Sequence, residues 1–164
     1  MKSRLLNYIL PVAVAMGLAT SAMADDAIKI GVTQPLTGAV AASGNYVVQG
    51  AKIAEDMINA SGGVLGKKIQ LIIEDNKSNP KEAVATAEKL IVSDKVPVLM
   101  GAWSSTYTLA VMPKLMEYGV PMVVETSSSG KITTSGNPWI FRISPTSEME
   151  AKSFGGKVDQ FKIK

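Results

Sequence analysis

The spacing of the apolar residues changes repeatedly along this chain of 164 residues. It alternates between a period of two, which is typical of a half-buried strand, and a period of about 3.6, which is typical of an amphipathic helix. A strand followed by a helix and a second strand forms a crossover unit, and such units build a parallel sheet. The pattern therefore predicts an α/β fold in which a parallel sheet is flanked by helices.

The expected strands are short apolar runs bounded by loops. They comprise residues 28–33, 69–73, 96–100, 121–125 and 139–143. The first run alternates apolar residues with others, as in a strand with one covered face. The stretch 127–137 is rich in Ser, Thr and Gly and has no apolar period, so we expect a surface loop or a loop with a turn there.

Helix signals occupy the intervals between these strands. One face of the first expected helix consists of Ala51, Ala54, Met57 and Ile58. Asn79 and Pro80 predict the start of a second helix, because Asn caps free N–H groups and Pro has its φ angle pre-set for the first turn. A third segment, residues 105–118, contains Pro113, so either a kinked helix or two short helices are expected. A further helix is expected to begin near Ser147.

The first 24 residues have the composition of a secretory signal peptide. Lys2 and Arg4 precede an apolar run over residues 5–18, and residues 22–24 (Ala-Met-Ala) have the small-x-small pattern of a cleavage site. A membrane anchor is the alternative, but this run is shorter than the ~20 apolar residues that span a bilayer. We therefore expect export through the Sec route, cleavage after Ala24 and a periplasmic location.

The remaining composition excludes several classes of function. Cleavage leaves 15 basic and 14 acidic residues, a formal charge of +1, and no basic run exceeds two residues, so nucleic-acid binding is not expected. The chain contains neither His nor Cys, so it lacks an ordinary general base at neutral pH, a thiol nucleophile and a soft metal site. Its glycine spacing matches neither a dinucleotide loop nor a Walker loop. We expect no enzymatic activity, no metal and no cofactor.

Two hydroxyl-rich loops follow two of the expected strands. Residues 101–106 (Gly-Ala-Trp-Ser-Ser-Thr) come after the third strand, and residues 126–130 (Thr-Ser-Ser-Ser-Gly) come after the fourth. Ligands of open α/β sheets bind beyond the carboxyl ends of the strands, where loop side chains and helix N-termini converge. Such a crevice suits a small anion, above all a carboxylate.

Ordinary structural roles compete with ligand binding in these loops. Ser105 stands where the third helix begins, so it could serve simply as the N-cap. Ser127 and Ser129 are expected to be solvated loop residues. Glu125 is a local candidate for the charge partner of a ligand ammonium, but we expect it to be a surface carboxylate. Trp103 could either contact a ligand through its ring or pack beneath the loop.

Several short motifs occur along the chain in a fixed order. They are residues 28–32 (IKIGV), 35–38 (PLTG), Gly50-Ala51, 58–67 (INASGGVLGK), Asp75, Asn79-Pro80, Ala83-Val84, Gly101 with Ser104-Ser105, and 119–121 (GVP). Their order and spacing resemble the type I periplasmic binding proteins of ABC importers, specifically the branched-chain amino-acid (Leu/Ile/Val) binding group. The resemblance covers residues 28–150.

The resemblance implies a particular domain organisation. Proteins of this group have two lobes that close over the ligand about a hinge, and they are more than twice as long as this chain. Residues 25–143 would then be a partial N-terminal ligand-binding lobe. Residues 144–164 would be the hinge exit and the truncated start of a second lobe, so the two-lobed fold would be incomplete.

The resemblance also implies a ligand site. It places the ligand's carboxylate against the hydroxyl and N–H of Ser105, with Ser104 beside it. The backbone of Thr126 and the hydroxyl of Ser128 would also contact the carboxylate. The positions of Trp103 and Ser43 would face the ligand's side chain. In the family, the acidic partner of a ligand ammonium comes from the second lobe.

The implied function is that of a periplasmic substrate-binding component of an ABC importer. Its ligand would be an amino acid of the branched-chain type or a related small carboxylate, and its partners would be the permease subunits in the inner membrane. Two alternatives remain open at this point: a ligand-sensing or regulatory domain of the same fold, and an inactive truncated fragment.

Overall fold

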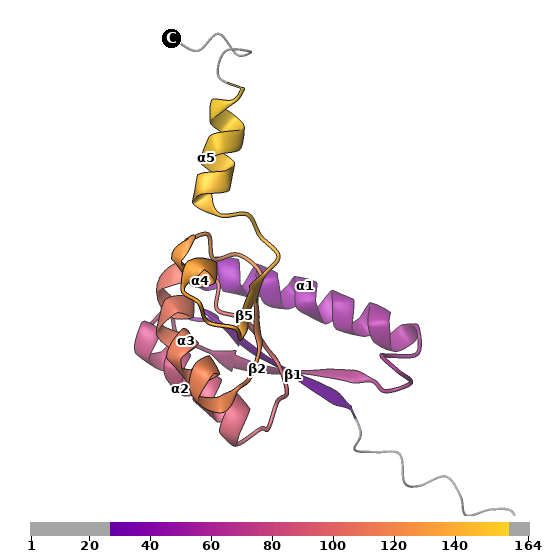
Figure 1. The fold of residues 1–164 in the computed structure, drawn as a ribbon. Helices are drawn as coiled ribbons and strands as arrows, with labels where there is room; N and C mark the ends of the chain where they lie inside the picture. The colour runs from indigo at the N-terminus through magenta and orange to yellow at the C-terminus, as the bar shows by residue number, and fades with distance from the viewer. Residues whose placement is uncertain (1–26, 158–164) are drawn as a thin grey trace, which may run out of the picture.

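The computed structural model describes residues 27–157, so the expected signal peptide with its cleavage site after Ala24 lies outside the described residues. Strands and helices alternate along this part of the chain (Figure 1). The strands are β1 (Ile28–Gln34), β2 (Ile69–Asp75), β3 (Leu99–Gly101), β4 (Met122–Val124) and β5 (Ile140–Arg142). The helices are α1 (Ala41–Ala60), α2 (Pro80–Val92), α3 (Ser105–Tyr118), α4 (Lys131–Thr134) and α5 (Ser147–Gly155).

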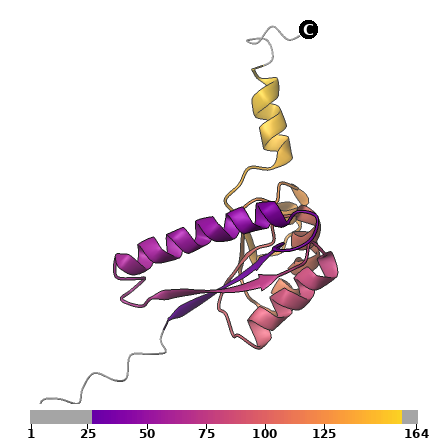
Figure 2. The same ribbon diagram turned by 180° about the vertical axis from the view of Figure 1, so that it is seen from behind.

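The five strands described form one parallel sheet in the order β2-β1-β3-β4-β5. Helix α1 covers one face of this sheet over β1 and β2, while α2 and α3 lie on the opposite face (Figures 1 and 2). The α/β prediction of a parallel sheet flanked by helices is therefore confirmed.

The main core fills the space between the sheet and the pair α2 and α3. Fully buried side chains come from α2 (Ala83, Ala87 and Leu90), from α3 (Val111 and Leu115) and from the strands (Leu99, Met122 and Val124). Helix α2 approaches β1 closely, because a Cβ added at Gly31 would lie 3.3 Å from the Cβ of Leu90. Burial of these apolar side chains supplies the main driving force that holds α2 and α3 on the sheet.

The start of α2 and the continuity of α3 both have local causes. Asn79 is the N-cap of α2, and its side chain accepts hydrogen bonds from the N–H groups of Lys81 (2.8 Å) and Glu82 (3.3 Å), as predicted. Helix α3 runs without a break through Pro113. Pro113 lies on the exposed side of this helix, where water can bond the backbone carbonyl that the proline leaves without its usual partner.

Some expectations about the elements need correction. Strands β3, β4 and β5 have three residues each, so β3 begins at Leu99 where residue 96 was expected. The stretch 127–137, expected to be a loop, contains α4, whose Ile132 is fully buried against the core. A single buried residue leaves no apolar period in the sequence, which is why this short helix escaped prediction.

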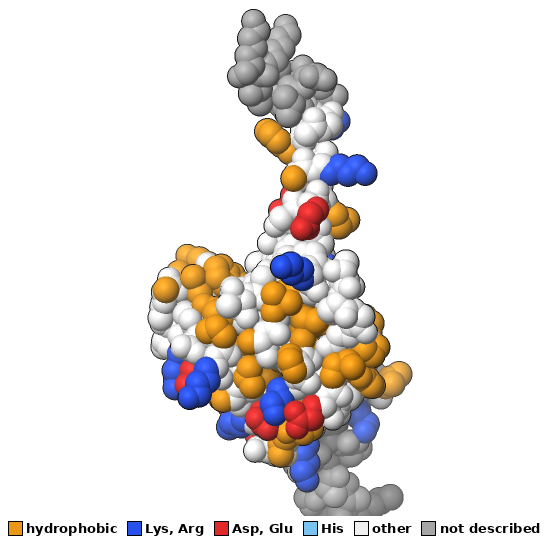
Figure 3. Space-filling model, turned by 60° about the vertical axis from the view of Figure 1, so that its left-hand side comes forward, with side chains coloured by type: hydrophobic (Ala, Val, Ile, Leu, Met, Phe, Trp, Pro, Cys, Tyr) orange, Lys and Arg blue, Asp and Glu red, His pale blue; other side chains and the backbone are white. Residues whose placement is uncertain are grey.

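The outer surfaces of α1 and α5 carry exposed apolar side chains. On α1, Met57 and Tyr46 are 66% and 73% exposed, and Val48 and Gly44 are its buried residues. Helix α5 stands clear of the body (Figure 3), and every one of its residues is exposed. Among the described helices, none is both long and apolar enough to cross a membrane.

Candidate functional site

The loops after β1, β3 and β4 meet at the carboxyl edge of the sheet. The strand order reverses at β1, because β2 lies on one side of it and β3 on the other. Open α/β sheets bind ligands in the crevice at such a switch point. The segments that reach this edge are the start of α1, which carries Ser43, residues 102–104 (the β3 loop) and residues 125–130 (the β4 loop).

Side-chain hydrogen bonds join the β3 and β4 loops. The Ser105 hydroxyl accepts from the backbone N–H of Ser129 at 3.1 Å, and the Ser127 hydroxyl donates to the carbonyl of Trp103 at 3.0 Å. The Ser127 and Thr108 hydroxyls are 2.8 Å apart. Ser127 is only 2% exposed, so the expectation of a solvated serine is wrong for this residue. It faces inward because it satisfies two polar groups of the neighbouring segment.

Ser104, rather than Ser105, is the N-cap of α3. The Ser104 hydroxyl accepts from the N–H of Thr106 at 3.3 Å. Ser105 is the first residue of the helix, where backbone N–H groups and the positive end of the helix dipole favour an anion. The N-cap alternative for Ser105 is therefore wrong; Ser105 is partly exposed, and its hydroxyl joins the first hydroxyl-rich loop to the second.

The other predicted site residues lie at the same edge of the sheet. Thr126 is exposed and Ser128 is partly exposed in the β4 loop, and the Ser128 carbonyl accepts from the N–H of Ser147 at 3.0 Å. Ser43 is partly exposed in the first turns of α1. The hydrogen bonds described bring Trp103, Ser105 and the β4 loop together, whereas Ser43 shares the edge through the sheet order alone.

Asp75 shapes the loop that leads from β1 into α1. Its carboxylate accepts from the N–H groups of Leu36 (2.8 Å), Thr37 (3.1 Å) and Lys77 (2.8 Å) and from the Thr37 hydroxyl (2.6 Å). Partial desolvation raises the pKa of Asp75, but these hydrogen bonds outweigh it and hold the pKa below the ordinary value of 3.8. The carboxylate therefore orders the approach to the segment that carries Ser43.

A part-buried polar pair joins the ends of β1 and β4, and it was not anticipated as such. Gln34, which is fully buried at the end of β1, donates from Nε2 to Oε1 of Glu125 at 2.7 Å. Burial raises the pKa of the Glu125 carboxyl, and hydrogen bonds from Gln34 and from the backbone N–H groups of Glu125 and Trp103 offset part of this rise. The expectation of a surface carboxylate is wrong, because Glu125 is only partly exposed and its Oε2 atom is buried.

Arg142 at the end of β5 holds the β4 loop from the opposite side. Its guanidinium donates to the carbonyls of Ser127 (2.9 Å, from Nη1) and Ser129 (2.6 Å, from Nη2). Two parallel donors on two carbonyls fix the course of the loop between them. Sequence reasoning did not select Arg142, although it is the one arginine after residue 24.

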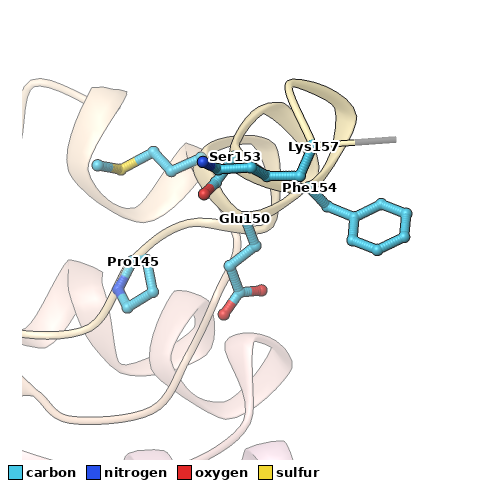
Figure 4. Close-up of a pocket in the computed structure, with 6 residues that line it drawn as sticks. Pro145, Glu150, Ser153, Phe154 and Lys157 are labelled. Atoms are coloured by element: carbon cyan, nitrogen blue, oxygen red, sulfur yellow. The ribbon is translucent and has the colours of Figure 1, made fainter. Parts of the chain in front are cut away.

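A hollow of about 600 Å³ lies along α5. Figure 4 shows Pro145 on the loop that enters the helix, and the other lining residues are Met149, Glu150, Ser153, Phe154 and Lys157. None of the predicted site residues lines it. Within residues 27–157, no group of three or more acidic residues gathers in a way that could hold a metal ion.

The comparisons with known proteins bear on this arrangement directly. The family model described as periplasmic binding protein matches residues 27–164. The chain belongs to the periplasmic binding protein family. The resemblance inferred from the motifs is thereby confirmed, as is the expectation that the chain is not an enzyme, because the family consists of binding proteins.

Individual relatives of this periplasmic binding protein agree with that placement. The Leu/Ile/Val-binding protein homolog 3 of Brucella melitensis biotype 1 is 38% identical over 130 residues, which are 79% of this chain and 34% of the relative. The structure resembles the substrate-binding protein of a branched-chain amino-acid transporter from Streptococcus pneumoniae in complex with isoleucine. That match has a TM-score of 0.70 and 32% identity and covers 73% of this chain and 34% of the other.

A relative with a different ligand is similarly close to this periplasmic binding protein. The solute-binding protein of an ABC transporter from Rhodopseudomonas palustris BisB5, in complex with 3,4-dihydroxybenzoic acid, has a TM-score of 0.67 and 33% identity. The match covers 74% of this chain and 33% of that protein. The chain thus spans about a third of the length of the relatives described here.

Proposed function

We propose that this chain is the N-terminal part of a periplasmic substrate-binding component of an ABC importer. Its ligand is an amino acid of the branched-chain type or a related small carboxylate. The observation that carries the proposal is the Ser105 hydroxyl, placed at the N-terminus of α3 and bonded to the β4 loop. Family membership and relatives in complex with isoleucine or a benzoic acid support it.

The ligand's carboxylate docks where the two hydroxyl-rich loops meet. Ser105 offers a hydroxyl and a helix N-terminal N–H, and Ser104 lies beside it as the N-cap. From the β4 loop, Thr126 contributes its backbone groups and Ser128 contributes its hydroxyl. Hydroxyl and N–H donors bind a carboxylate through charge-assisted hydrogen bonds, which are stronger than bonds between neutral groups.

The rest of the ligand lies against Trp103 and Ser43. A partly exposed tryptophan ring at the strand edge offers a large apolar face for an aliphatic or aromatic group. Ser43, near the start of α1, leaves room on the opposite wall. This division of space suits branched-chain amino acids and benzoic acids alike, so the class of carboxylate is decided by experiment.

Closure of a second lobe over this crevice completes the mechanism. Residues 25–143 form part of the first lobe, and residues 144–164 are the hinge exit and the start of the second. The complete exposure of α5 supports this division, because a helix without a buried residue has its packing partner elsewhere. Ligand binding favours the closed form, and the permease subunits in the inner membrane recognise that form.

A thermal-shift experiment tests the proposed function. Residues 25–164 are joined to the second lobe of the Streptococcus pneumoniae relative, and the melting of this chimera is followed with leucine, isoleucine, 4-hydroxybenzoate and 3,4-dihydroxybenzoate. A ligand at 100 times its Kd raises stability by about 2.7 kcal/mol, so binding is visible as a higher Tm. Cooperative melting with no shift from any of the four carboxylates contradicts the proposal.

A further inference from the structure

The segment that leaves the sheet after β5 holds the β4 loop by three consecutive carbonyls. Arg142, the last residue of β5, donates to the carbonyls of Ser127 (2.9 Å) and Ser129 (2.6 Å). The backbone N–H of Ser147, the first residue of α5, donates to the carbonyl of Ser128 at 3.0 Å. The start of α5 is therefore bonded directly to the loop that carries proposed carboxylate ligands.

The bond from Ser147 links α5 to the β4 loop and is not part of the helix itself. The first N–H groups of a helix have no acceptor within it. The Thr146 side chain caps α5 by accepting from the N–H of Met149 at 3.2 Å, which leaves the Ser147 N–H for the Ser128 carbonyl. Helix α5 stands clear of the body (Figure 3) and has no buried residue, so apolar packing does not fix its first turn. A swing of α5 therefore strains this bond.

A single peptide group carries the connection from α5 into the crevice. The carbonyl of Ser128 and the N–H of Ser129 belong to the same peptide unit, which is planar. The carbonyl accepts from Ser147 at 3.0 Å, and the N–H donates to the Ser105 hydroxyl at 3.1 Å. A tilt of this plane at the carbonyl end therefore also moves the N–H relative to Ser105. The two bonds reinforce each other as well, because hydrogen bonds in a chain polarise one another.

The Ser105 hydroxyl is the far end of this chain of bonds. Its oxygen accepts from the Ser129 N–H, so its own hydrogen remains available for a further acceptor. A carboxylate in the crevice is such an acceptor. The bond from Ser129 thus fixes the hydroxyl oxygen and leaves the hydrogen for the ligand.

We propose that the peptide group between Ser128 and Ser129 couples α5 to the carboxylate site. The Ser147 N–H is the positioning group that holds this peptide in the orientation in which it bonds Ser105. Ligand binding and the position of α5 thus favour each other, and the coupling is equal in both directions. The effect on the ligand rests on the proposed function, whereas the link between Ser147 and the bond of Ser129 to Ser105 does not.

Two substitutions of one residue separate the N–H from the side chain. Ser147→Pro removes the donor, and proline is tolerated at the first position of a helix. Thr146 before it already has the extended conformation that a residue before proline adopts, with φ −86° and ψ 158°. Ser147→Ala keeps the N–H and loses only an exposed hydroxyl, so it is the matched control. Both variants are made in the chimera with the Streptococcus pneumoniae second lobe.

The first readout, amide hydrogen exchange followed by NMR, needs no ligand. Ser147→Pro is expected to speed exchange of the Ser129 amide about threefold, within the range of one ordinary hydrogen bond, and Ser147→Ala to leave it unchanged. The amides of β2, at the opposite edge of the sheet, should keep their rates in both variants, which separates this coupling from a general loss of stability. An unaltered Ser129 amide in folded Ser147→Pro overturns the inference.

Ser105→Ala tests the same link from the other end. It removes the acceptor of the Ser129 N–H and should speed exchange of the Ser147 amide by a similar factor, because the coupling is reciprocal. If Ser147→Pro does not fold, this variant decides: an unaltered Ser147 amide in it overturns the inference.

The second readout is the Kd for isoleucine and for 3,4-dihydroxybenzoate, measured by calorimetry. Ser105 contacts the carboxylate that both ligands share, so Ser147→Pro should weaken each of them by the same factor of about three, and Ser147→Ala should change neither. Unchanged Kd values in Ser147→Pro overturn the coupling to the ligand. If neither carboxylate binds the unaltered chimera, the proposed function fails, while amide exchange still decides the link between α5 and Ser105.

Discussion

The hydroxyl of Ser105 accepts a hydrogen bond from the backbone N–H of Ser129 at 3.1 Å, across 24 positions of sequence. The Ser105 side chain thus connects the N-terminus of α3 to the β4 loop. Because Ser104 already caps the helix, the position of Ser105 is explained by the junction of the two loops.

Ser105→Ala tests this junction as a carboxylate site. In the chimera that carries a second lobe, the substitution is expected to weaken binding of the ligand by about 1 to 3 kcal/mol, the usual loss for a hydrogen bond to a charged group. Isothermal titration calorimetry gives the affinity, with Thr133→Ala on the exposed surface of α4 as control. Unchanged affinity would mean that the ligand's carboxylate binds elsewhere along this edge of the sheet.

Asp75→Asn tests the carboxylate that orders the loop before α1. The pKa of Asp75 is held below 3.8, so its contribution to stability is present above that pH and is lost as the pH falls through the lowered pKa. We expect the variant to unfold more easily by about 1 to 3 kcal/mol at pH 7, where the carboxylate bonds are intact. Urea unfolding curves of variant and parent should converge at strongly acidic pH.

The matched control for Asp75 is Asp56→Asn, because Asp56 is exposed on α1. Its unfolding free energy should differ little from that of the parent at either pH, since exposed groups away from special contacts contribute little. If the difference in unfolding free energy between Asp75→Asn and the parent stays constant down to acidic pH, the charge of the Asp75 carboxylate does not contribute to stability.

Glu125→Gln tests the buried carboxyl by its pH dependence. Burial raises the pKa of Glu125, so the folded protein holds a proton that the unfolded chain releases near pH 4.5. Stability of the parent therefore falls as the pH rises from 4.5 through the raised pKa, because ionisation of a buried group opposes folding. The Tm of Glu125→Gln relative to the parent should increase over that interval and then level off. A difference that does not vary with pH would place the carboxyl in solvent.

Arg142→Lys tests the clamp on the β4 loop. A lysine keeps the charge but cannot reach two carbonyls in parallel, so the bonds to Ser127 and Ser129 are not both replaced. The free energy of unfolding is expected to fall by about 1 to 3 kcal/mol, as for loss of a charged hydrogen bond. Hydrogen exchange of the amides in residues 127–130 should accelerate, whereas Lys52→Ala on the exposed side of α1 should leave them unchanged.

Short-range signals in the sequence determined most of the element order. The switch in apolar period located the sheet strands, and Asn79 with Pro80 marked the start of α2, because capping acts within a few residues of the cap. The motifs led to the family and to the two hydroxyl-rich loops. Where the apolar signal shrank to one residue, as at Ile132 in α4, the prediction failed.

Tertiary structure alone decided which polar groups meet at the edge of the sheet. Gln34 bonds Glu125 because β1 and β4 both lie beside β3, and no local spacing encodes that order. Ser127 faces inward because Trp103 and Thr108 lie opposite it. Periodicity reports whether a residue faces a helix, a sheet or solvent, whereas the partner of a buried polar group depends on which distant segment packs there. The sequence thus determined the elements and the family, and the packing of the sheet decided the shape of the site.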